Sequence, residues 1–114
     1  MKKYFLSLIP ILFIHLIISG QIKKENTPED IFRDAIFFYN KEDFREAAYL
    51  FQQLLKNDPD NANFNFYAGM SWLNIKNQET NSIPFLQKSV LLTDIKYKKR
   101  NFKERKAPHH AWFY

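Results

Sequence analysis

The chain has 114 residues and a formal net charge of +5, and this length leaves room for one domain at most. It is 46% hydrophobic with only two glycines, so it can bury a core, whereas glycine-rich phosphate loops and a turn-rich sheet fold are disfavoured. Cysteine is absent, which excludes disulfides, thiolate metal sites, cysteine nucleophiles and a lipid-modified cysteine.

Residues 1–20 have the pattern of a secretory signal peptide. A short basic start precedes the apolar run 4–18, and a polarity break with small residues follows it. We expect cleavage after Gly20. An uncleaved membrane anchor is the alternative, although Pro10 and His15 interrupt the run, which is shorter than the ~20 residues of a spanning helix. In either case we expect the rest of the chain to be exported.

Residues 21–26 are polar and predict a flexible leader, and a helix is expected from residue 28 to about 40. Thr27 is a suitable N-cap, and Pro28 and Asp30 suit the first turn. The apolar residues fall on two adjacent stripes, so this helix must contact two partners. The stripes are Ile31, Ala35 and Phe38, and Phe32, Ile36 and Tyr39.

A second helix is predicted between Asp43 and Pro59. Asp43 and Glu46 have the spacing of a capping box, and the apolar residues that follow recur every three or four positions. Proline disfavours the helical conformation of the residue before it, so the helix should end near Asn57. Residues 27–59 therefore predict a helix hairpin.

The same pattern returns 34 positions later, where Gly69 matches Ala35 and Trp72 matches Phe38. Small residues at both positions would let a neighbouring helix approach closely. A second hairpin is expected, with helices at 60–74 and 81–92 joined by a turn at 76–79. Its second helix is offset by 35 residues, because the turn is one residue longer.

A helix–turn–helix period of 34 residues resembles the tetratricopeptide repeat family. The positions that carry the resemblance are Ala35, Phe38, Ala47, Phe51 and Pro59, and then Gly69, Trp72, Ser82, Leu86 and Ser89. Leu54 departs from the family pattern, which usually has a small residue there, and no proline closes the second unit directly after Asp94. The resemblance implies an all-α fold in which two tetratricopeptide-like hairpins over 27–94 follow an N-terminal signal helix. Residues 107–114 would be the truncated start of a third repeat.

The arrangement also resembles the amino-terminal segment of cell-envelope proteins of Gram-negative bacteria. In those proteins the repeats precede a β-propeller-like region and a peptidoglycan-binding domain. This resemblance implies a non-catalytic scaffold for protein–protein contacts in the periplasm or at the outer membrane. An inactive truncated remnant is the alternative. With two complete units the open end of the array is expected to self-associate.

In the repeat family the first helix of each unit lines a concave groove that binds a protein or peptide partner. The resemblance places that groove at Phe32, Ile36, Tyr39, Asn40, Asn63, Phe66, Met70, Leu73 and Asn74. The competing interpretation is that these side chains form the core.

Residues 95–106, here called the basic insertion, hold seven cationic side chains against Glu104. These are Lys96, Lys98, Lys99, Arg100, Lys103, Arg105 and Lys106. The favoured interpretation is a solvated insertion whose Tyr97 and Phe102 rings pack on the repeats. Binding of anionic envelope lipid or of nucleic acid through this patch is the alternative.

The remaining polar residues do not predict catalysis. His109 and His110 are adjacent, and adjacent side chains on a helix diverge by about 100°, so a shared metal site is not expected. The acidic residues lie mostly where helix caps and turns are expected. The sequence therefore predicts no enzyme, no cofactor and no metal site.

Overall fold

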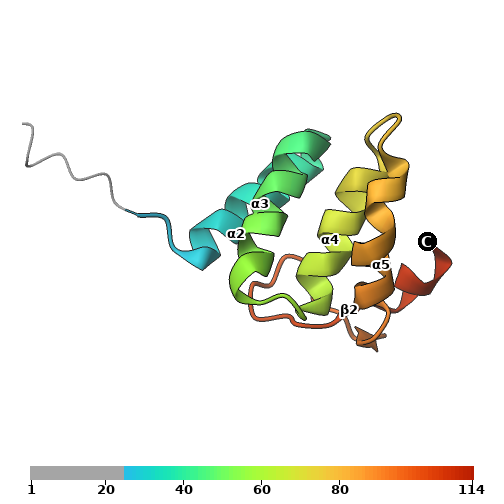
Figure 1. Cartoon of the computed structure of the whole chain (residues 1–114). Coiled ribbons are helices and arrows are strands. Elements are labelled where there is room, and N and C mark those ends of the chain that lie inside the picture. The colour runs from blue at the N-terminus through green and yellow to red at the C-terminus, as the bar shows by residue number, and fades with distance from the viewer. Residues whose placement is uncertain (1–24) are drawn as a thin grey trace, which may run out of the picture.

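The computed structural model describes residues 25–114, and its helices lie side by side with short connections (Figure 1). The predicted signal peptide and most of the leader lie outside the described residues. The described part is mostly helical, and none of its helices is long and apolar enough to cross a membrane. Its α-helices are α2 (Pro28–Asn40), α3 (Phe44–Asn57), α4 (Ala62–Leu73) and α5 (Ile83–Ser89). Two short 3₁₀ helices, η1 (Glu79–Ser82) and η2 (His109–Phe113), and two strands, β1 (Thr93–Asp94) and β2 (Ala107–Pro108), complete the chain.

Helix α2 begins at the predicted capping residue. Thr27 Oγ1 accepts a hydrogen bond from the Asp30 N–H at 3.2 Å, and Asp30 Oδ2 accepts one from the Thr27 N–H at 3.2 Å. These reciprocal bonds satisfy two N–H groups that the first turn leaves free, so the local sequence defines this helix end.

Helix α3 begins after Asp43, but only half of the expected capping box forms. The Asp43 carboxylate accepts from the Glu46 N–H at 3.4 Å. The Asp43 N–H, which the box would direct to Glu46, donates instead to the Phe38 carbonyl at 3.0 Å. The tight turn from α2 therefore satisfies this donor, and the expectation of a full box is wrong.

Helix α4 is the centre of the fold. It packs against α3 on one side and α5 on the other, and every residue from Asn61 to Gly69 is buried. The Asn61 side chain caps it by accepting from the Phe64 N–H at 3.1 Å. The enclosed part of α4 carries apolar side chains around most of its circumference, and its two buried asparagines, Asn63 and Asn65, both make hydrogen bonds.

Helix α5 is shorter than expected, since the sequence predicts a helix over 81–92. The segment begins as 3₁₀ helix η1, and the α-helical part ends at Ser89. Beyond it the Leu92 carbonyl accepts from the Ala107 N–H at 2.8 Å. A pairing with a distant segment therefore redirects the backbone that local preference would have kept helical.

The strands β1 and β2 form a parallel two-residue bridge, in which Thr93 pairs with Ala107 and Asp94 with Pro108. The expectation of an all-α fold did not include this bridge. The bridge brings the two ends of the basic insertion together and starts η2, a 3₁₀ helix where the start of a third repeat is expected. Ala107 and Ala111 are buried against the helices.

The aromatic core joins the first three helices. The rings of Phe51 on α3 and Tyr67 on α4 are stacked with centroids 5.1 Å apart. Phe32 on α2 meets Phe51 edge to face at 6.2 Å, and Tyr39 meets Tyr67 in the same way at 5.0 Å. Such pairs are worth about 0.5–1.5 kcal/mol beyond the area they bury, so each ring fixes the place of its neighbour.

Candidate functional site

The residues expected to line a partner groove lie on α2 and α4, and they differ in exposure. Those that are buried are Phe32, Ile36, Asn63 and Phe66. Those that are half-buried are Tyr39, Met70 and Leu73, and those that are exposed are Asn40 and Asn74. The C-terminal ends of α2 and α4 stay accessible, while the parts nearer their N-termini are covered.

The cover over Phe32 is part of the basic insertion. The Phe102 ring lies 5.8 Å from the Phe32 ring and is stacked on the Phe64 ring at 6.2 Å. One aromatic side chain of the insertion therefore bridges α2 and α4. This contact occupies the space in which an extended ligand would meet these two helices.

A second anchor lies deeper, where the Tyr97 hydroxyl donates to Asn63 Oδ1 at 2.6 Å. Burial raises the pKa of Tyr97 well above its usual range, and burial likewise raises the pKa of the neighbouring Tyr39 to about 12. Asn63 is fully buried, and its Nδ2 has no hydrogen-bond partner among the described residues. Tyr97 thus satisfies an acceptor that would otherwise be buried without a donor.

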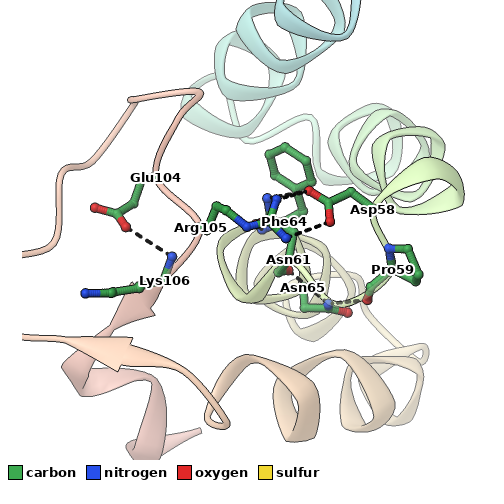
Figure 2. A network of polar contacts seen from close by, with 8 residues as sticks. All are labelled: Asp58, Pro59, Asn61, Phe64, Asn65, Glu104, Arg105 and Lys106. Carbon is green, nitrogen blue, oxygen red and sulfur yellow. Dashed lines mark hydrogen bonds and ion pairs between the residues drawn. The ribbon is translucent and has the colours of Figure 1, made fainter.

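The third anchor is Arg105, whose guanidinium reaches the Asp58 carboxylate before α4 (Figure 2). The two parallel bonds measure 2.6 Å for Nη1–Oδ2 and 2.9 Å for Nη2–Oδ1. Hydrogen bonding to Arg105 holds the pKa of Asp58 below its usual value. The Arg105 carbonyl also accepts from the Ala62 and Asn63 N–H groups at 3.1 and 3.3 Å, so the insertion caps helix α4.

Lys106, the last residue of the insertion, ties it to the residue before its start. Its Nζ lies 3.0 Å from Asp94 Oδ2, across the bridge between β1 and β2. Glu104 directs its carboxylate to backbone N–H groups, accepting from Lys98 at 3.2 Å and from Lys106 at 3.0 Å. The one acid of the insertion is therefore used to fold the loop.

The expected anion-binding patch is divided by these contacts. Arg105 and Lys106 are held in ion pairs. The other five cations are exposed and take part in none of the ion pairs found within residues 25–114. They are Lys96, Lys98, Lys99, Arg100 and Lys103.

An apolar end, here defined as the exposed faces of α5 and η2, was not assigned residue by residue from the sequence. It surrounds a cavity of about 520 Å³. The residues that line it include Leu73, Ile83, Leu86, Val90, Trp112 and Tyr114. Ile83 and Trp112 are 51% and 62% exposed. The stripe at 83, 86 and 90 could have been recognised by its helical spacing. Leu86 is buried, and the exposure of the positions beside it depends on where the chain goes after Ser89.

The two adjacent histidines do not act together. The His110 ring lies 5.7 Å from the Phe66 ring and 6.2 Å from the Tyr114 ring, and both histidines are exposed. Within residues 25–114, no group of three or more histidine or acidic side chains is arranged to hold a metal ion.

Comparison with family models, with curated proteins and with solved structures finds no match to this chain.

Proposed function

We propose that the chain is an exported, non-catalytic protein-interaction module of the cell envelope, built from two tetratricopeptide-like hairpins. We further propose that it binds its partner at the apolar end formed by α5 and η2. One observation carries this proposal, namely the group of large apolar side chains left exposed around a single cavity.

The apolar end exposes several large side chains close together in the chain. Trp112, Phe113 and Tyr114 are 62%, 84% and 56% exposed, and Ile83 on the neighbouring helix is half-exposed. Soluble monomers rarely expose contiguous apolar patches larger than a few hundred Å². Aromatic residues are enriched at the centres of protein interfaces, where they account for much of the binding energy.

The form of the apolar end favours a helical partner. Ile83, Leu86 and Val90 stand at intervals of three and four residues along and just beyond α5, and all three line the cavity. Leu86 is already packed against Gly69 of α4, so an amphipathic helix would bury its apolar face on Ile83 and Val90, in the way that consecutive helices of the protein pack on one another.

The groove on α2 and α4 is the weaker candidate. Phe102 and Tyr97 of the basic insertion contact Phe32, Phe64 and Asn63, so an incoming peptide would first have to displace them. The exposed asparagines Asn40 and Asn74 lie at the far ends of these two helices.

The repeat assignment rests on packing at matched positions. Ala35 is completely buried, and Gly69 lies against Leu86 of α5. The export assignment rests on the sequence pattern of residues 1–20 alone.

Site-specific photo-crosslinking in the native cell tests the proposed surface. A photoreactive phenylalanine analogue is placed at Trp112 or, as the matched control, at Tyr49, which is 57% exposed on α3. We expect a discrete adduct from position 112 and none from position 49. The adduct mass tells a second copy of the chain from another protein. Equal labelling at both positions, or labelling at 49 alone, would reject the apolar end.

A further inference from the structure

The cations of the basic insertion serve two different purposes. Arg105 and Lys106 fold the loop, through ion pairs with Asp58 at 2.6 Å and with Asp94 at 3.0 Å. Removing either cation would take away one of the anchors of the loop. Neither is therefore free to bind a ligand.

The other five cations lie in residues 96–103, a stretch that contains no acidic residue. A turn holds its centre, because the Asn101 N–H donates to the Lys98 carbonyl at 3.3 Å and Arg100 has a φ of 66°. Glu104, the nearest acid in the sequence, accepts from two backbone N–H groups. The stretch thus presents concentrated positive charge to solvent.

Both aromatic rings of the insertion face the helices. Phe102 packs on Phe32 and Phe64, and the Tyr97 hydroxyl is held by Asn63. Proteins that hold single-stranded nucleic acid combine cations with rings on which the bases stack. Here the rings are not available, so the surface offers charge without a stacking platform.

Exposed aliphatic side chains precede the cations directly. Ile95 is 83% exposed and Leu91 is 81% exposed, and Ile95 is followed by Lys96. Aliphatic groups beside a cluster of lysines suit the boundary between lipid headgroups and acyl chains. The cavity of about 450 Å³ under this turn is lined by Lys99 and Arg100 together with Arg33 and Glu29, so one acid of α2 faces the cluster.

We propose that Lys96, Lys98, Lys99, Arg100 and Lys103 form a docking surface for an anionic lipid membrane. Clusters of four to eight Lys or Arg side chains bind anionic lipid surfaces. None of these five residues lines the cavity of the apolar end.

The test compares two variants of the native exported protein that lose the same charge. One carries Lys98→Gln, Lys99→Gln and Lys103→Gln. The other carries Lys41→Gln, Lys56→Gln and Lys76→Gln, which removes exposed lysines from other parts of the fold. Binding is measured to vesicles of phosphatidylcholine with and without phosphatidylglycerol, at low and high salt, and thermal melting checks that both variants fold.

We expect the native protein to bind only the vesicles that contain phosphatidylglycerol, and to lose that binding at high salt. The insertion variant should bind about a hundredfold more weakly, since each of the three lysines contributes about a factor of five. The control variant should bind almost as well as the native protein. Equal weakening in both variants would overturn the proposal, because it would assign the binding to net charge. Absence of binding to either kind of vesicle would also overturn the proposal. So would binding of a single-stranded oligonucleotide that persists when free phosphate is added as a competitor.

Discussion

Gly69 on α4 lies so close to Leu86 on α5 that a methyl group added at Gly69 would stand 2.7 Å from Leu86 Cδ2 and Cγ and 3.2 Å from its backbone nitrogen. The two helices can approach this closely only because residue 69 has no side chain. The sequence pattern predicts the contact, since a small residue was expected where a neighbouring helix approaches.

Gly69→Ala should therefore destabilise the fold. Alanine is favoured over glycine inside a helix by about 1 kcal/mol, but overpacking a core costs about 1–3 kcal/mol. We expect a net loss of about 1 kcal/mol in the free energy of unfolding, or a few degrees in melting temperature.

A double-mutant cycle with Leu86→Ala provides the control for this effect. The Leu86→Ala background removes the two side-chain atoms at 2.7 Å and keeps only the backbone nitrogen at 3.2 Å, so Gly69→Ala should there become neutral or stabilising. If the alanine is equally destabilising in both backgrounds, the close approach is not its cause.

Removing the Tyr97 hydroxyl should cost more than the loss of one exposed hydrogen bond. Tyr97→Phe keeps the ring but leaves Asn63 Oδ1 buried without its donor. We expect a loss of about 1–3 kcal/mol in chemical denaturation, the typical cost of an unsatisfied buried polar group. Adding Asn63→Leu to that variant should restore part of the loss. Further destabilisation would show that the Asn63 amide stabilises the fold in another way.

Acid should weaken the contact between Arg105 and Asp58. Hydrogen bonding to Arg105 lowers the pKa of Asp58 in the folded state, so the contribution is present above the unfolded pKa of about 3.9. It is lost as the pH falls through the lower folded pKa. The pair is partly exposed, so about 0.5–1 kcal/mol is expected at neutral pH.

Asp58→Asn measures that contribution. The variant should be less stable than the native protein at pH 7, and the two should converge in strong acid, where Asp58 is protonated in both states. A difference that stays constant down to strong acid would assign the effect to the capping of the turn and not to charge.

Alkali should unfold the protein in the pH range where its buried tyrosines lose their protons. Burial raises the pKa of Tyr39 to about 12 and also raises the pKa of Tyr67 and of Tyr97. A raised folded pKa gives stability that is complete below the unfolded pKa of about 10 and is lost as the pH rises through the folded value. We expect cooperative loss of helical circular dichroism above about pH 10, coincident with a step in tyrosinate absorbance. Smooth tyrosinate titration with the helix signal unchanged would contradict this.

The sequence predicts the first two helices best, because their ends depend on neighbouring residues. Thr27 and Asp30 cap α2 as the spacing indicates, and α3 ends before Pro59. The end of α5 depends on the Leu92–Ala107 pairing, which joins segments far apart in the chain and leaves no local pattern.

The functional surfaces, too, are predictable from the sequence only where they depend on neighbouring residues. The charge of residues 96–106 and the packing of Tyr97 and Phe102 could be anticipated from composition. The place where those rings dock could not, and it lies over the residues expected to form the partner groove. The exposure of Trp112 depends likewise on the path of the insertion, because β2 places η2 beside α5.

The most direct test of the account is the affinity of the crosslinked partner for Ile83→Glu, compared with Tyr49→Glu on the opposite part of the helical layer. Both residues are about half exposed, so neither variant should lower the melting temperature by more than a few degrees. We predict that Ile83→Glu weakens binding by roughly a hundredfold, because a charge would be buried in the apolar end, and that Tyr49→Glu leaves it unchanged. Undiminished binding by Ile83→Glu would contradict the account.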